Sequence, residues 1–147
     1  MVENSIEQVG YLLDTNIISE PTRLQPDLGV MDKLSYLSDA CGLSAVTLHE
    51  LRFGWLRMPE GAKKQAIGSY ISQVVVQYPC FGYDAKAARV HAEIRTYCQK
   101  NGIALPFVDG QIAAIAIANG FVLVTRNLKD FKGIEGLRLE NWFTGLV

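Results

Sequence analysis

The chain has 147 residues, of which 49% are hydrophobic and 20% are charged. This length and balance are typical of one globular domain and exclude an intrinsically disordered protein. With 14 Lys and Arg against 15 Asp and Glu, the net charge is -1, so any basic surface for nucleic acid has to be local. We therefore expect a single domain over residues 1–147.

Three features bear on the compartment. Residues 1–8 contain two acids and no apolar run, so they do not resemble a secretory signal. The most apolar stretch, 112–125, is far shorter than the roughly 20 residues that a membrane-spanning helix needs. Cys41, Cys80 and Cys98 are odd in number and widely spaced, which favours buried, reduced thiols over disulfides or a zinc site. These features predict a soluble, cytoplasmic protein without membrane contact.

In the first half of the chain, two short apolar segments are each followed by a helical pattern. The predicted strands are Gly10–Asp14, which runs into a polar turn, and Cys41–Ala45. The predicted helices cover residues 28–37, a segment capped by Ser44 or Thr47, and Ala62–Val76, which ends before Pro79.

The second half repeats this alternation. The predicted strands are Cys80–Phe81, Phe121–Thr125 and Leu137–Glu140, and the middle one is apolar without alternation, as in strands buried on both faces. The predicted helices run from the N-cap Asp84 to Asn101, and from Gln111 to Asn119 after an opening Asp109. Strands that alternate with helices predict a three-layer α/β fold with a mostly parallel sheet.

Four acidic residues are expected at one edge of this sheet. Asp14 directly follows the first strand and Asp130 follows the strand 121–125, and ligands of parallel sheets bind beyond the carboxyl ends of the strands. Asp109 is expected at a helix start, where the helix dipole favours a carboxylate, and Glu50 one or two turns into its helix. Taken singly, each acid is also explained as a cap or a surface residue.

Carboxylates that are crowded together repel each other and raise one another's pKa values. A divalent cation relieves this repulsion, and oxygen ligands without Cys or His select hard ions such as Mg²⁺ or Mn²⁺. Such an ion can activate a water that attacks a phosphodiester. From the residues alone we predict an α/β domain with an acidic site. This arrangement suits metal-assisted hydrolysis of a phosphodiester.

Four segments resemble the motifs of PIN-domain proteins, especially the VapC/FitB-type toxins of bacterial toxin–antitoxin pairs. They are Leu12–Glu20, Ser44–Gly54, Pro106–Ala114 and Val124–Phe131, and the resemblance covers residues 11–142. It implies a three-layer α/β/α sandwich with a five-stranded parallel sheet. It also implies a Mg²⁺- or Mn²⁺-dependent endoribonuclease that acts as a toxin and hydrolyses RNA with a metal-activated water.

The resemblance implies that Asp14, Glu50 and Asp109 are catalytic carboxylates that bind the metal. Many relatives carry a further Asp two residues after the Thr of the fourth motif, where this chain has Asn127. Asp130 lies three residues further on, and other relatives have this arrangement. We therefore take Asp130 as the fourth catalytic and metal-binding acid.

Three polar residues are expected to support these acids. Thr125 would hydrogen-bond a carboxylate and orient it, Asn16 would brace Asp14 in the same way, and Asn127 would be a polar contact. Ordinary hydrogen bonding at a turn or strand end is the alternative for Thr125 and Asn16.

His49 precedes Glu50 in the chain, so on a helix it points about 100° away from it, and contact with RNA is not expected of it. Two groups of basic residues would form a local basic rim or ordinary solvated helix faces: Arg52, Arg57, Lys63 and Lys64, and Arg126, Lys129 and Lys132. In the sequence, no aromatic residues interleave with these charges as in a base-stacking surface.

The resemblance also implies partners: an RNA substrate, a cognate antitoxin protein, and a second copy in a homodimer or higher assembly. Such antitoxins often bind DNA, so contact with DNA would be indirect, and they insert a segment near the acidic groove. The apolar residues Phe53, Trp55, Leu56 and Met58 would pack in the core by default, or else form a dimer face or receive that segment.

Two other functions compete with this one. Haloacid-dehalogenase-like phosphatases also place an Asp after the first strand, but they carry a second Asp two residues later, where this chain has Asn16. A non-catalytic PIN domain that acts as an interaction module is the other alternative, and the four filled acidic positions count against it.

Overall fold

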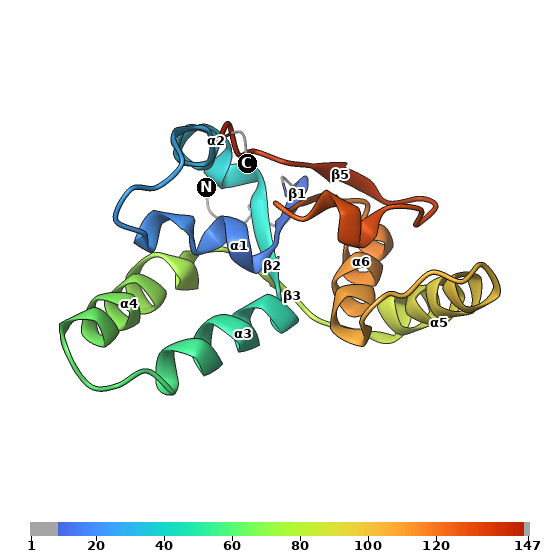
Figure 1. Ribbon diagram of the computed structural model, residues 1–147, viewed down its shortest axis with the longest axis horizontal. Coiled ribbons are helices and arrows are strands. Elements are labelled where there is room, and N and C mark those ends of the chain that lie inside the picture. The colour runs from blue at the N-terminus through green and yellow to red at the C-terminus, as the bar shows by residue number, and fades with distance from the viewer. Residues whose placement is uncertain (1–8, 146–147) are drawn as a thin grey trace.

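A computed structural model describes residues 9–145 (Figure 1). The strands are β1 (Tyr11–Leu13), β2 (Cys41–Ser44), β3 (Cys80–Phe81), β4 (Val122–Val124) and β5 (Arg138–Glu140). The α-helices are α1 (Thr15–Ile18), α2 (Leu28–Leu37), α3 (Ala45–Leu56), α4 (Ala62–Gln73), α5 (Ala85–Lys100) and α6 (Phe107–Asn119). Short 3-10 turns are η2 (Glu20–Thr22), η3 (Ser38–Ala40), η4 (Val75–Gln77) and η5 (Leu128–Phe131). Residues 1–8, on which the argument against a secretory signal depends, lie outside the described part.

The five strands form one sheet in the order β3-β2-β1-β4-β5, and all neighbouring strands are parallel. The chain starts at the centre and builds outward on one side and then on the other, so β1 and β4 flank the point where the order reverses. In such sheets the ligand crevice lies beyond the carboxyl ends of these two strands. Leu13 pairs with Val124, which places the next residues, Asp14 and Thr125, side by side at that edge.

Helices cover both faces of the sheet, because alternate strand residues point to opposite sides. Leu12 and Leu123 pack with residues of α5 and α6, whereas Leu13 and Val124 pack with residues of α1, α2 and α4. Figure 1 shows α5 and α6 on one side of the strands and α1, α2 and α4 on the other. This burial on two faces explains the unbroken apolar runs, and the predicted three-layer sandwich with a five-stranded parallel sheet is confirmed.

Three elements differ from the sequence predictions near their ends. The polar turn after β1 is the one-turn helix α1, because the Asp14 carboxylate accepts a hydrogen bond from the Thr15 N–H and caps it. Helix α6 begins at Phe107, behind Pro106, so Asp109 lies in its first turn and is not its N-cap. Helix α4 ends at Gln73, and a 3-10 turn leads from it toward β3.

The three cysteines differ in their exposure to solvent. Cys41 and Cys98 are buried, as expected, but the prediction of burial is wrong for Cys80, which is exposed. The reason is that Cys80 belongs to β3, an edge strand of the sheet. None of the helices described is long and apolar enough to cross a membrane.

Asp27 fastens the segment after β5 to the start of α2. Its carboxylate accepts hydrogen bonds from the backbone N–H groups of Val30, at 3.1 Å, and of Thr144 and Gly145, at 2.9–3.2 Å. Desolvation raises the pKa of this carboxyl, but the hydrogen bonds from Thr144, Val30 and Gly145 together outweigh it and lower the pKa to about 2. The ionised Asp27 is thus tied into the fold.

Asp27→Ala is therefore expected to lower the melting temperature at pH 7, because it removes a helix cap and the tie to the C-terminal segment. The contribution of a carboxyl with a lowered pKa is present above pH 3.8 and is lost as the pH falls through about 2. Thermal unfolding between pH 2 and pH 7 tests this, with the exposed Asp32→Ala in the same helix as the control. Equal melting temperatures of Asp27→Ala and wild type at pH 7 would contradict it.

Candidate active site

Asp14 occupies the carboxyl edge of the sheet between β1 and β4. Its Oδ1 accepts a 2.8 Å hydrogen bond from the Thr15 N–H, and its Oδ2 accepts one of 2.8 Å from the Thr125 hydroxyl. The backbone N–H of Asp14 donates to the Val124 carbonyl at 2.9 Å, which extends the pairing of β1 with β4 by one residue. Asp14 is 9% exposed, so this carboxylate is held in one orientation at the edge of the core.

The surroundings of Asp14 disfavour its charge. Burial is the largest influence and raises the pKa of this carboxyl, while the hydrogen bonds from Thr125 and Thr15 lower it. The charges of Glu50 and Asp130 raise the pKa further, and the net direction is upward. An ionised Asp14 is therefore costly unless a positive charge comes to it.

Glu50 reaches the site from α3. The helix begins directly after β2, where the Ser44 hydroxyl accepts a 3.0 Å hydrogen bond from the Thr47 N–H, as the expected cap. The Thr15 hydroxyl donates a 2.6 Å hydrogen bond to Glu50 Oε1. Thr15 thus joins both acids: its N–H holds Asp14 and its hydroxyl holds Glu50. The sequence interpretation gave Thr15 no role, although its place directly after the strand-end Asp was a signal.

Asp109 lies in the first turn of α6, on the other side of the sheet. Burial raises the pKa of this carboxyl to about 6, and the charges of Asp14, Asp130 and Glu50 add to the effect. Helix α6 lies close to α5 here, as the next residue, Gly110, shows: a Cβ added to it would come within 2.5 Å of the His91 ring. The charges of all three other acids thus contribute to the raised pKa of Asp109.

The segment after β4 contributes the remaining predicted residues. Asp130 is exposed in the turn η5, and its charge acts on both Asp14 and Asp109. The Asn127 N–H donates to the Thr125 hydroxyl at 3.1 Å, so it supports the threonine that holds Asp14. Asn16 accepts a 3.1 Å hydrogen bond from the Arg126 N–H, so it ties α1 to this segment. The hydrogen bond expected of Thr125 is present, and that of Asn16 goes to the backbone instead.

The four acids fit a hard divalent cation by their donor chemistry. They offer only oxygen, and in residues 9–145 no Lys or Arg forms an ion pair with any of them. As the side chains are placed, no three His, Cys, Asp or Glu residues in the described part form a group that could hold a metal ion. A bound cation would therefore have to draw the carboxylates closer together.

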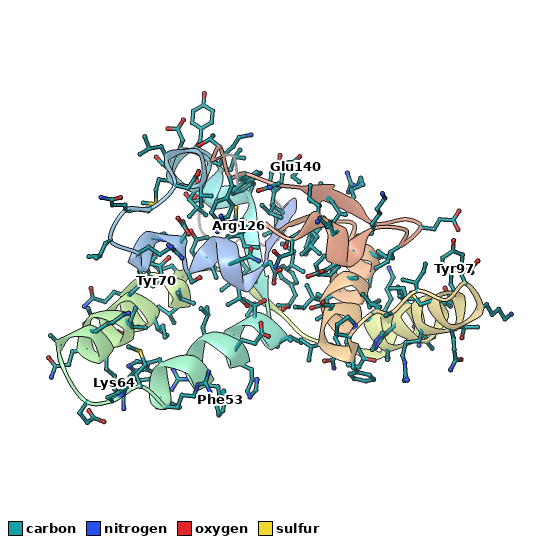
Figure 2. The ribbon with its side chains drawn as sticks, in the orientation of Figure 1. Phe53, Lys64, Tyr70, Tyr97, Arg126 and Glu140 are labelled. Atoms are coloured by element: carbon teal, nitrogen blue, oxygen red, sulfur yellow. The ribbon has the colours of Figure 1, made fainter. Side chains whose placement is uncertain are left out.

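A groove of about 370 Å³ opens beside Thr15 and Glu50, between α1, α3 and α4. Trp55 and Met58 line it, and the Trp55 ring lies against Gly68 of α4. Figure 2 shows Tyr70 on α4 beside α1, where its hydroxyl donates a 2.7 Å hydrogen bond to the Ile18 carbonyl. Core packing is the wrong expectation for Phe53 and Leu56, the other two residues of that predicted set of four, which are 56% and 55% exposed.

Comparison with known proteins identifies the family. Residues 11–137 match the PIN domain. Toxin FitB of Neisseria gonorrhoeae is 36% identical over 89% of this chain and 97% of its own length, and VapC ribonuclease Y4jK of Sinorhizobium fredii is 32% identical over 88% and 95%. The solved structure of FitAB bound to an IR36 DNA fragment matches 92% of this chain and 97% of its own, with a TM-score of 0.84 and 31% identity. The chain belongs to the PIN domain family, as its four motifs predicted.

Proposed function

We propose that this protein is a metal-dependent endoribonuclease and the toxin of a toxin–antitoxin pair. The observation that carries the proposal is the buried Asp14 carboxylate, held through both oxygens and surrounded by further acids at the edge where such sheets bind ligands. The names of its relatives, a FitB toxin and a VapC ribonuclease, support RNA as the substrate and a toxin as the role.

PIN-domain nucleases generally need a divalent metal. We propose Mg²⁺ or Mn²⁺, held by Asp14, Glu50, Asp109 and Asp130, since all-oxygen donors favour hard ions. When bound, such an ion supplies an attacking water and offsets the charge that develops on the phosphate.

The chain's own residues keep these ligands in place. Thr125 and the Thr15 N–H fix both oxygens of Asp14, and the Thr15 hydroxyl fixes one oxygen of Glu50. Asn127 supports Thr125 from behind. Because hydrolysis by water needs no covalent intermediate with the protein, no side chain has to act as a nucleophile.

The remaining proposals concern partners and compartment. We expect a cognate antitoxin to insert a segment near the acids, and the apolar groove beside Glu50 provides a surface for it. DNA would be contacted through the antitoxin, in line with the DNA-bound structure of FitAB. The homodimer or higher assembly, the single-domain extent over 1–147 and the cytoplasmic location stay predictions.

Metal dependence is the direct test of the proposed activity. Purified protein without antitoxin is expected to cleave total RNA or a labelled oligoribonucleotide in Mg²⁺ or Mn²⁺. EDTA should stop cleavage, and excess Mg²⁺ or Mn²⁺ should restore it, because the carboxylates alone offer no attacking group. Gel electrophoresis of the RNA measures the result, and equal cleavage in EDTA would refute the proposal.

Two further assays separate the alternatives. A haloacid-dehalogenase-like phosphatase would hydrolyse small phosphate esters such as p-nitrophenyl phosphate, whereas we expect no turnover. A silent interaction module would leave growth unchanged when expressed without a partner, whereas a ribonuclease toxin should arrest it.

A further inference from the structure

The outer face of α3 carries three side chains in an exposed stack, namely His49, Phe53 and Arg57. They follow one another at a spacing of four residues, which places them on one face of a helix. The His49 and Phe53 rings are stacked with centroids 6.0 Å apart and an angle of 11° between their planes. The Arg57 guanidinium lies 5.2 Å from the centre of the Phe53 ring. Figure 2 shows Phe53 on the side of α3 that faces away from the sheet.

This stack begins next to the candidate active site. Glu50 follows His49 in the chain and lies about 60° around the helix from Phe53, at a rise of about 1.5 Å per residue. Trp55, on the opposite side of the helix, and Met58, just past its end, line the apolar groove. Glu50 therefore borders two surfaces, the groove on the inner side of α3 and the stack on its outer side.

The charges along α3 match a nucleic acid. Arg52 and Arg57 form no ion pair in the part of the chain that is described, and each lies over an aromatic ring. Both guanidinium groups can contact phosphates, while the stack as a whole, with the Phe53 ring 56% exposed, offers planar surface to an unpaired base. Leu56, which is 55% exposed on the same helix, gives this face an apolar component as well, so the experiment has to separate RNA binding from a protein interface.

We propose that His49, Phe53 and Arg57 form a stacking platform for the unpaired bases of RNA that enters the acidic site. This inference rests on the proposed ribonuclease function and adds to it the helix face that holds the bases of the substrate beside the acids. The sequence-based expectation that no aromatic residues lie among these charges is wrong, since Arg52 and Arg57 lie over Trp55 and Phe53. The platform was missed because its three residues are separated in the chain and only the helical turn aligns them.

The test compares Phe53→Ala with wild type on a short, unpaired oligoribonucleotide. We expect KM to rise about 5- to 100-fold, because base stacking on one aromatic ring contributes roughly that much to binding, and kcat to change less than about twofold. Phe53→Trp should restore KM, since indole also stacks.

Arg57→Gln should weaken RNA binding, and the salt dependence of binding should fall by about one phosphate contact. Tyr36→Ala on α2, where the ring is 88% exposed, is the matched control and should leave KM unchanged.

Direct binding separates the platform from other effects of the substitution. Fluorescence anisotropy with Asp14→Asn as the background, in which cleavage is blocked, should show weaker binding of the unpaired oligoribonucleotide on Phe53→Ala. Binding of a blunt RNA duplex should change less than about twofold, because paired bases cannot stack on the ring. Circular dichroism and the melting temperature are expected to match wild type, since Phe53 is exposed.

Three outcomes decide against the inference, and they are distinguishable. If wild type cleaves RNA but Phe53→Ala has unchanged KM and Kd, the platform is refuted and the ribonuclease stands. If wild type neither binds nor cleaves RNA in Mg²⁺ or Mn²⁺, the proposed function fails, and the platform with it. If Phe53→Ala keeps its RNA affinity but loses antitoxin neutralisation or self-association, α3 presents a protein interface and the platform is refuted.

Discussion

Replacing Asp14 with asparagine is expected to reduce metal-dependent RNA cleavage more than about 100-fold, because it removes the charge of the carboxylate that we propose as a metal ligand. The fold should persist, since asparagine has the same shape and can hydrogen-bond to the same two partners, with the bond to Thr125 reversed in direction. Its oxygen can accept from the Thr15 N–H, and its amide can donate to the Thr125 hydroxyl, which already accepts from the Asn127 N–H. The melting temperature in EDTA should be equal to that of wild type or higher, because burial raises the pKa of Asp14 and so disfavours its charge.

Single-turnover cleavage in Mg²⁺ or Mn²⁺ and thermal unfolding in EDTA together measure this result. Asp84→Asn is the matched control, because Asp84 is the N-cap of α5 and accepts a 2.9 Å hydrogen bond from the Ala87 N–H. Asparagine caps helices about as well as aspartate, so this variant should keep both its activity and its stability. In cells, Asp14→Asn should relieve growth arrest while Asp84→Asn does not. Full activity of Asp14→Asn would exclude Asp14 from the chemistry.

Much of the fold and part of the candidate site could be predicted from the sequence, because they depend on local patterns. The apolar runs of β1 and β4 identify buried parallel strands, and a residue that follows such a strand must lie at its carboxyl edge. Asp14 and Thr125 could therefore be expected together at one edge, and the hydrogen bond between them agrees. Glu50 and Asp109 were expected near this edge from their places in predicted helices, and the motif resemblance added their role as metal ligands.

Contacts between helices could not be predicted in this way. The hydrogen bond from Thr15 to Glu50 joins residues 35 positions apart, and it needs α1 and α3 to meet at the sheet edge. Asp109 was expected as a helix cap, but Pro106 starts the helix earlier, because its fixed backbone angle suits a first turn. The exposure of Phe53 depends on which face of α3 packs on α4, and the apolar residues on both sides of this helix left that open.

Asp109→Asn is expected to make the metal-free protein more stable at neutral pH while it reduces RNA cleavage strongly. In the folded chain, burial and then the charges of Asp14, Asp130 and Glu50 raise the pKa of Asp109 to about 6 from 3.8. The folded state thus binds a proton more readily than the unfolded state. The stability linked to this proton is complete below pH 3.8 and is lost as the pH rises through about 6.

Asparagine at position 109 has no charge to lose, so the variant should exceed wild type above pH 6 by up to about 2 kcal/mol, a figure that allows for partial exposure to solvent. The two proteins should converge near pH 3.5. Urea unfolding in EDTA between pH 3.5 and pH 8 measures the difference, with the exposed Asp39→Asn as the control.

Added Mg²⁺ or Mn²⁺ should reverse the order of stability. A ligand that binds only the folded state stabilises it more the more tightly it binds, and wild type keeps all four carboxylates whereas the variant has lost one. The same charges that destabilise the metal-free site would thus favour the cation. If Asp109→Asn is no more stable than wild type at pH 8 in EDTA, Asp109 experiences neither the burial nor the charges of the other three acids. The four residues would then not act as one site, and the assignment of Asp109 as a metal ligand would fail even if the protein cleaves RNA.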